Sequence, residues 1–164
     1  MIDFFPESHI KVLSERRFGI CDPGEHQPAY AAKDNGENWI AAVDNFYQEY
    51  ISFIPVDHCI EFDDNGKRCD CFLFHGQSII FIELKDRKGR HSHEWLKGAD
   101  EQLRSTIARF ETECERSKDF VDKRAYVANR QKPHFQSGQM NRIQSFRKET
   151  GYVLRISKEI KIHE

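Results

Sequence analysis

Apolar residues recur at two different spacings along the chain, and each spacing predicts a type of element. Residues 37–50 (ENWIAAVDNFYQEY) place large apolar side chains at i, i+3, i+4 and i+7, so a helix is expected there. Residues 94–116 repeat this spacing over a greater length and predict a second, longer helix. Its apolar stripe consists of Leu96, Ala99, Leu103, Ile107, Phe110 and Cys114.

A third helix is predicted from about Ser137, which can cap it, to residue 150. Gly151 follows immediately and is well placed to end this helix. The residues expected to face inward are Met140, Ile143 and Phe146.

Shorter runs rich in β-branched and aromatic residues predict strands between and after these helices. The Asn-Gly pair within DDNGK (63–67) indicates a turn that joins the first two strands as a hairpin. The runs are 51–62 (ISFIPVDHCIEF), 68–74 (RCDCFLF), 78–85 (SIIFIELK), 124–129 (RAYVAN) and 152–162 (YVLRISKEIKI).

The predicted order is therefore helix, three strands, helix, strand, helix, strand. Because strands that are apolar on both faces must be covered on both faces, we expect a three-layer α/β domain with a central mixed sheet flanked by helices. Residues 1–164 are read as a single domain. In it, 1–36 are expected to be irregular, 37–130 form the core, and 131–164 add a C-terminal helix and strand.

Composition supports a folded protein of the cytoplasm. The 164 residues are 38% hydrophobic, enough for one domain with a substantial core. No apolar run approaches the length of about 18 residues that a membrane helix needs, and the acidic start does not resemble a signal peptide. The five cysteines are an odd count, which fits reduced thiols in a cytosol.

Charge is distributed unevenly between the two halves of the chain. Residues 1–84 carry 6 Lys or Arg against 15 Asp or Glu, whereas residues 85–164 carry 19 against 12. A basic second half could meet a polyanion. The alternative is that opposite charges simply cover one globular surface.

The stretch 68–88 (RCDCFLFHGQSIIFIELKDRK) contains charged residues inside two apolar strands. A two-residue turn at 76–77, with Gly first, predicts a type II′ hairpin. The resulting register opposes Asp70 and Glu83, and Lys85 shares the face of Glu83 because alternate residues of a strand point the same way. Two carboxylates and one ammonium group are therefore expected at one end of the sheet.

Like charges in directly opposed positions destabilise a sheet unless something lies between them. A divalent cation fits, because Mg²⁺ prefers carboxylate oxygens and keeps waters that a phosphate can displace. The alternative is a strand-end ion pair in which Lys85 neutralises Asp70 and Glu83.

Asp70, followed thirteen residues later by Glu83 and then by Lys85, resembles the Asp…(Asp/Glu)-x-Lys motif of the PD-(D/E)xK nuclease superfamily. This superfamily includes restriction endonucleases and archaeal Holliday-junction resolvases. The resemblance covers roughly residues 37–130 and implies a restriction-endonuclease-like αβββαβ core. It also implies hydrolysis of phosphodiester bonds, with DNA as the expected substrate and RNA as the less common one.

The same resemblance implies roles for individual residues. Asp70 and Glu83 would bind Mg²⁺ or Mn²⁺, and Lys85 would assist the attacking water. Gln102 on the following helix would support them; a polar residue that merely flanks the helix stripe is an equally good interpretation. An acid of the first helix can add a metal ligand, and Glu37 is preferred over Glu49.

Basic residues after the motif are candidates for contacts with a phosphate backbone. They form one group directly after the third strand and a weaker group after the fourth. Neither group resembles a helix that reads bases. The candidates are Arg87, Lys88, Arg90, Arg130 and Lys132.

Other interpretations of the sequence stay open. Cys69 and Cys71, with His58, Cys59 and His75, could suggest zinc, but the paired knuckles of zinc sites are absent and buried thiols fit better. A non-catalytic module of the same fold, binding nucleic acid or a partner protein, is the main rival to a nuclease. As an enzyme, so small a core is expected to act as a homodimer or beside a partner subunit.

Overall fold

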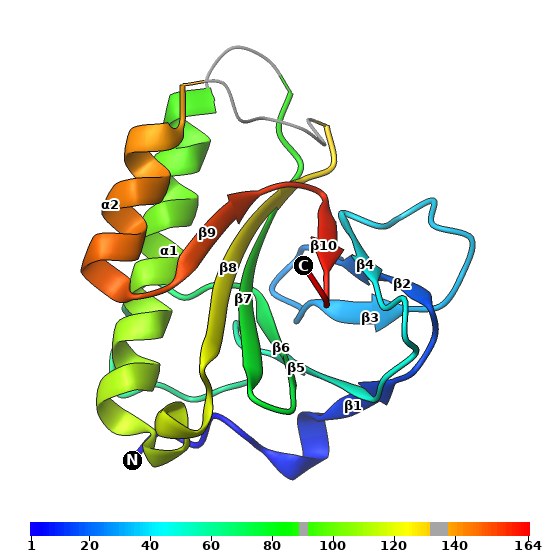
Figure 1. Ribbon diagram of the computed structural model, residues 1–164, viewed down its shortest axis with the longest axis horizontal. Helices are drawn as coiled ribbons and strands as arrows, with labels where there is room; N and C mark the ends of the chain where they lie inside the picture. Colours follow the sequence, from blue (N-terminus) through cyan, green and yellow to red (C-terminus); the bar gives the residue numbers. More distant parts are fainter. Residues whose placement is uncertain (89–91, 132–137) are drawn as a thin grey trace.

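The computed structural model describes residues 1–88, 92–131 and 138–164, which form two mixed β-sheets and two α-helices (Figure 1). Both helices cover one face of the larger sheet, and the smaller sheet covers its other face. The α/β class is therefore confirmed. The expectation that helices flank both faces is wrong, because a second sheet forms one of the three layers.

The larger sheet has six strands in the order β1-β5-β6-β7-β8-β9. β5, β6 and β7 are an antiparallel meander, whereas β8 and β9 run parallel to β7. The strands are β1 (Lys11–Leu13), β5 (Ile51–Pro55), β6 (Cys71–His75), β7 (Ser78–Lys85), β8 (Asp122–Asn129) and β9 (Val153–Ile156).

The smaller sheet has four strands in the order β10-β4-β2-β3. β2 pairs antiparallel with both β3 and β4, and β10 adds a parallel strand on the other side of β4. The strands are β2 (Arg17–Cys21), β3 (Tyr30–Ala32), β4 (Ala41–Asp44) and β10 (Glu159–Lys161).

The two helices occupy the connections between parallel strands of the larger sheet. α1 (Ser92–Glu113) joins β7 to β8, and α2 (Met140–Thr150) joins β8 to β9. Two short 3-10 helices, η1 (Glu7–His9) and η2 (Glu115–Asp119), complete the described elements. Among the described residues, no helix has both the length and the apolar character needed to cross a membrane.

The core is divided by the larger sheet into two layers. Phe72 and Phe81 point toward α1, whereas Leu73 and Ile80 point toward the smaller sheet, so β6 and β7 are apolar on both faces. This double burial explains why these strands read as continuous apolar runs in the sequence. A charged residue in either strand is therefore surrounded by apolar layers.

The predicted register of the β6–β7 hairpin is confirmed over five pairs. The backbone of Gly76 takes a φ of 53° as the first residue of the turn, as a type II′ turn requires. The pairs are His75–Ser78, Phe74–Ile79, Leu73–Ile80, Phe72–Phe81 and Cys71–Ile82. The regular ladder ends there, because the amide of Asp70 donates to the Ile82 oxygen instead of pairing with Glu83.

The long helix and the end of the last helix also agree with the sequence analysis. Five of the six stripe residues of α1 are buried, and Cys114 lies just past the helix end at an intermediate depth. Gly151 ends α2 with a left-handed φ of 82°. Within α2, Phe146 is buried as expected, but Met140 is 64% exposed, which corrects its predicted inward position. Ser137, the predicted cap, lies outside the described residues.

The helix predicted over 37–50 is wrong. Its centre is β4, which lies between β2 and β10, and the following turn is held by Asn45, whose side chain bonds the backbone of residues 15 and 49. Such side-chain to backbone bonds compete with a helix. Three aromatic residues expected on the apolar face, Phe46, Tyr47 and Tyr50, are exposed, whereas Trp39 is buried.

Three other segments differ from expectation. Residues 1–36 contain three strands instead of irregular chain, and the strand predicted over 51–62 ends at Pro55. The strand predicted over 152–162 is divided into β9 and β10, which belong to different sheets. The chain passes between the two sheets at Ser157, whose amide still donates to the Val127 oxygen.

The tight fit of the smaller sheet can be tested with two glycines. A Cβ at Gly19 in β2 would lie 2.0 Å from the Trp39 ring, whereas a Cβ at Gly98 in α1 would meet no atom within 4 Å. Gly19→Ala should lower the free energy of unfolding by about 1–3 kcal/mol through overpacking. Gly98→Ala, the matched control, should raise it by about 0.5–1 kcal/mol through helix propensity. Urea denaturation measures both, and equal effects would contradict the packing of Trp39 on β2.

Candidate active site

Glu83 is a buried acid near the end of β7, with 2% of its surface exposed. Alternate residues of β7 share a face, so Glu83 points toward α1, on the side of Ile79 and Phe81. Burial raises the pKa of Glu83 well above its ordinary value, and the nearby carboxylate of Asp70 raises it further. A charged Glu83 therefore requires positive charge close by.

Asp70 precedes β6 and is fixed by the backbone of β7. Its Oδ2 accepts a hydrogen bond of 2.7 Å from the Leu84 amide, and its own amide donates to the Ile82 oxygen at 3.2 Å. Burial raises the pKa of Asp70 to about 6, although the bond from Leu84 acts in the opposite direction. The side chains of Asp70 and Glu83 thus meet, even though their backbones are not a regular ladder pair.

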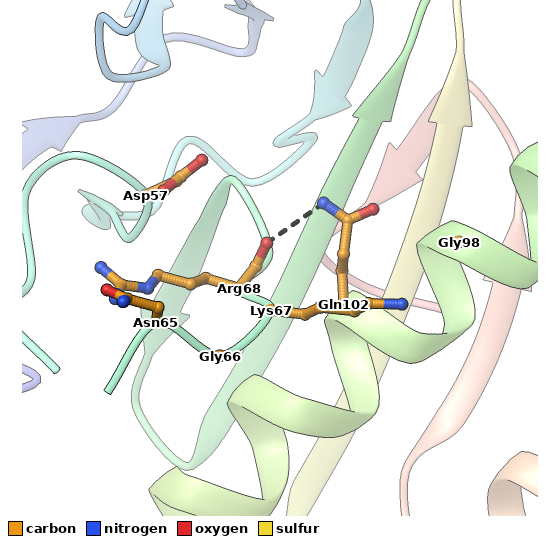
Figure 2. Close-up of a pocket in the computed structure, with 7 residues that line it drawn as sticks. All are labelled: Asp57, Asn65, Gly66, Lys67, Arg68, Gly98 and Gln102. Carbon is orange, nitrogen blue, oxygen red and sulfur yellow. Dashed lines mark hydrogen bonds between the residues drawn. The ribbon is translucent and has the colours of Figure 1, made fainter. Parts of the chain in front are cut away.

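Lys85 and Gln102 connect these acids to α1. Lys85 Nζ lies 3.1 Å from Glu83 Oε2 and donates to Gln102 Oε1 at 3.1 Å. Gln102 in turn donates from Nε2 to the Arg68 carbonyl oxygen at 3.3 Å, as Figure 2 shows. The structure therefore brings together four of the predicted residues, Asp70, Glu83, Lys85 and Gln102.

The donor set fits a hard divalent cation. Asp70 Oδ2 is engaged with the Leu84 amide and Glu83 Oε2 with Lys85, and the two carboxyl groups lie within hydrogen-bond reach of each other, so that a shared proton or a cation can bridge them. Glu83 Oε1 is buried and accepts no hydrogen bond among the described residues. A buried acceptor without a donor is costly, and Mg²⁺ or Mn²⁺ would satisfy it with the oxygen ligands that these ions prefer.

Two hollows lie beside this cluster and share Gly98 of α1 in their walls. The first, of about 460 Å³, is the pocket of Figure 2 and is bordered by Gln102. Its other lining residues are Asp57, Asn65, Gly66, Lys67 and Arg68. The second, of about 370 Å³, is lined by Lys85, Arg87, Lys88, Glu94 and Trp95. Lys85 of the second hollow is hydrogen-bonded to Gln102 of the first, so the two hollows lie next to each other at the cluster.

The residues predicted to contact nucleic acid lie in different surroundings. Arg87 and Lys88 are exposed directly after β7, and the backbone of Arg87 is held by the buried side chain of Asn129. Arg130 forms an ion pair with Asp86, so its charge is already partly compensated. Arg90 and Lys132 lie outside the described residues.

Glu37 and Glu49 do not join the Asp70–Glu83 cluster through any contact found among the described residues. The helix expected to carry them is absent; Glu37 is exposed in the turn before β4, and Glu49 contacts His75 and His163. Asp22, which follows β2, is the acid that the sequence reasoning missed. Its charge contributes to the raised pKa of Asp70. The segment around Asp22 carried only turn signals, so nothing in the sequence indicated this position.

Cys69 and Cys71 are buried thiols, and the suggested zinc cluster does not form among the residues that the structure describes. Cys69 packs in the core next to α1, whereas Cys71 packs between the sheets, so the two thiols lie on opposite faces of the larger sheet. The β6–β7 ladder becomes irregular at Asp70, which lies between them, so the usual alternation of strand faces does not hold there. Burial raises the pKa of both thiols well above the ordinary value, which disfavours a thiolate nucleophile.

Comparisons with protein-family models, with curated proteins and with solved structures found no match to this chain.

The cost of the acid pair without metal can be measured by Glu83→Gln in EDTA near pH 8. The amide removes one of two adjacent buried acids and can donate to Asp70 while still accepting from Lys85. We expect the free energy of unfolding to rise by about 1 kcal/mol, or Tm by about 2–4 °C. Glu61→Gln, at an exposed glutamate, is the control and should change little. A clear fall in Tm for Glu83→Gln would favour a structural ion pair with Lys85 instead.

Proposed function

We propose that this protein is a metal-dependent nuclease of the PD-(D/E)xK type, hydrolysing phosphodiester bonds in nucleic acid, with DNA as the expected substrate. The observation that carries the proposal is the buried Glu83 carboxyl group beside Asp70, with Lys85 bonded to it. A protein that used these residues only for stability would gain more from apolar side chains of similar volume. Their retention in an apolar strand fits a site where charge is needed.

The strand order gives the proposal further support. The antiparallel meander β5–β6–β7, followed by α1 and the parallel strand β8, corresponds to the three strands, helix and strand expected of a restriction-endonuclease-like core. The first helix of that core is missing, and the four-stranded sheet covers the corresponding face. A nuclease built this way would take any additional acid from the smaller sheet, for which Asp22 is the candidate.

Each residue has a distinct task in the proposed reaction. Asp70 and Glu83 would hold the cation through their carboxylate oxygens, and Gln102 keeps the Lys85 ammonium group directed at the acids. A bound Mg²⁺ would neutralise charge on the phosphate and lower the pKa of a coordinated water. Lys85, only 16% exposed, can then donate to the scissile phosphate or orient the attacking water.

The two hollows provide a path for the phosphate backbone across the site. Cations line both, with Lys67 and Arg68 in the first and Arg87 and Lys88 in the second. Such contacts give affinity that depends on salt but carry no sequence information. Gly98 between the hollows has no side chain to obstruct the path. Binding is therefore expected to tolerate many sequences.

Substitution of Lys85 should affect the cleavage rate, whereas substitution of its exposed neighbours should affect nucleic-acid binding. Lys85→Met, which keeps the apolar stem, should lower the single-turnover cleavage rate by about 100-fold or more and change affinity little. Arg87→Ala with Lys88→Ala should instead weaken binding and flatten its salt dependence by up to about two units of slope. Labelled linear, circular, branched and single-stranded DNA and single-stranded RNA, with Mg²⁺ for cleavage and Ca²⁺ for binding, provide the measurements.

Lys118→Met, at an exposed lysine in η2, is the control and should alter neither quantity. Normal cleavage by Lys85→Met would contradict the role given to Lys85. Binding without cleavage, in Mg²⁺ and in Mn²⁺, would favour a non-catalytic module of the same fold. If neither DNA nor RNA binds, the proposed function is wrong.

A further inference from the structure

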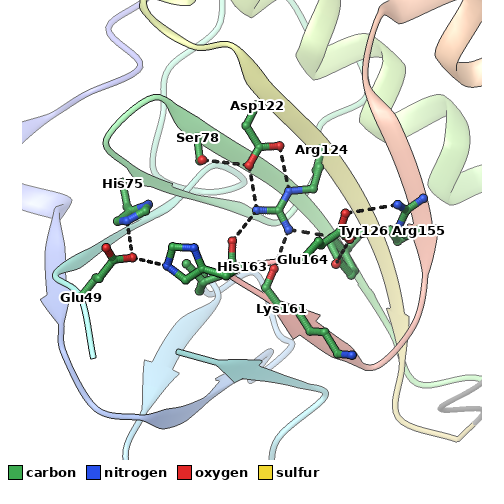
Figure 3. Close-up of polar contacts among 11 residues, drawn as sticks. Glu49, His75, Ser78, Asp122, Arg124, Tyr126, Arg155, Lys161, His163 and Glu164 are labelled. Carbon is green, nitrogen blue, oxygen red and sulfur yellow. Dashed lines mark hydrogen bonds and ion pairs between the residues drawn. The ribbon is translucent and has the colours of Figure 1, made fainter. Parts of the chain in front are cut away.

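A second cluster of possible metal ligands lies at the other end of β6 from Asp70. One ligand atom each from Glu49, His75 and His163 lies within 4.8 Å of the other two. Figure 3 shows the imidazole rings of His75 and His163 both directed at one oxygen of the Glu49 carboxylate. The five residues of β6 separate this cluster from Asp70 by roughly 17 Å along the strand, so it is independent of the proposed active site.

The three side chains come from three separate parts of the fold and converge on one point. Glu49 lies in the turn between β4 and β5, His75 ends β6, and His163 follows β10. The Nε2 atoms of both histidines face the same oxygen, Glu49 Oε2, with His75 at 2.5 Å. Segments distant in sequence therefore direct three potential ligands to a common centre.

The backbone on the Glu49 side is held firmly. The fully buried side chain of Asn45 donates to the carbonyl oxygens of Glu15 and Glu49, at 3.1 and 2.9 Å, and accepts from the Glu49 amide at 3.1 Å. His75 is fixed in turn by its ladder pair with Ser78. These two ligands are thus positioned before any ion arrives.

The segment that carries His163 is fixed by a buried arginine. Arg124 donates to the Lys161 carbonyl oxygen, as Figure 3 shows, and to the Ile162 carbonyl oxygen at 2.8 Å. The Ile162 amide also donates to the Asp44 oxygen at 3.1 Å, and the Tyr47 ring packs edge-on against His163. The position of His163 therefore does not depend on its contact with Glu49 alone.

We propose that Glu49, His75 and His163 form a binding site for a transition-metal ion of the Zn²⁺ class. Two imidazole nitrogens and one carboxylate oxygen are a common three-residue ligand set for zinc, and imidazole favours Zn²⁺ over Mg²⁺. The side chains of Glu49 and His163 are 38% and 40% exposed, so solvent can supply the fourth ligand. The site differs in chemistry from Asp70 and Glu83, which offer oxygen alone.

The bound ion would cross-link parts of both sheets. It would tie the chain after β10, in the smaller sheet, to the β6–β7 hairpin of the larger sheet. Because an ion that binds only the folded state stabilises it, zinc should raise Tm by about 5–10 °C at roughly 100 times its Kd.

The experiment is a titration of the full chain carrying Asp70→Asn, with several millimolar Mg²⁺ present, so that the acid pair of the other site does not contribute. Co²⁺ should give the intense visible bands of a four-coordinate ion, and calorimetry with Zn²⁺ should show one site. Adding His163→Asn should weaken zinc binding by more than about 100-fold. Loss of a residue that only hydrogen-bonds to a metal ligand typically weakens metal binding by about 10–100-fold, so a larger effect identifies His163 as a ligand. Glu49→Gln should also weaken zinc binding.

His58→Asn is the matched control. His58 also lies beside a carboxylate, with its Nε2 3.4 Å from Asp57 Oδ2, and beside the His26 ring, but these three residues are not among the described groups whose ligand atoms converge. This variant should bind zinc like the parent. Circular dichroism and urea melts without metal verify that each variant is folded. Equal zinc affinity for His163→Asn and His58→Asn, or no four-coordinate Co²⁺ spectrum in the parent, would show that the cluster is an ion pair and overturn the proposal.

Discussion

The carboxyl group of Glu83 lies within the apolar interior of the larger sheet, and the surrounding structure is arranged to make that position tolerable. β7 has β6 and β8 as neighbours, α1 on one face and the smaller sheet on the other, so Glu83 has little access to water. Only Lys85 forms an ion pair with it among the described residues. Since Asp70 adds a second acid at the same place, one ammonium group is insufficient compensation. A divalent cation would complete the balance.

The smaller sheet covers one face of the larger sheet and also leads to residues near both candidate metal sites. It occupies the face where a helix was expected, and its β2 strand leads to Asp22, whose charge reaches Asp70. It also receives β10, the strand that leads to His163. One sheet thus lies close to both candidate metal sites, one near each end of β6.

The parts of the structure that could be predicted are those governed by neighbouring residues. Gly76 and Gln77 specified the hairpin turn, the turn specified the register, and the register brought Asp70 near Glu83. The stripe of α1 was long enough to indicate a helix that places Gln102 beside Lys85. β4 could not be predicted in this way, because its partners β2 and β10 are distant in the sequence and its residues also fit a helical spacing. The contact between Glu49, His75 and His163 depends on the same distant pairing.

The most direct test of the central claim is calorimetric titration with Mn²⁺ of two proteins that both carry His163→Asn, one with Asp70 and one with Asp70→Asn. The asparagine still accepts from the Leu84 amide but removes one anionic ligand, so folding should be preserved. The parent should bind one Mn²⁺, and Asp70→Asn should bind at least about 10-fold more weakly. Equal binding by both proteins, or no binding by the parent, would contradict a cation site between Asp70 and Glu83.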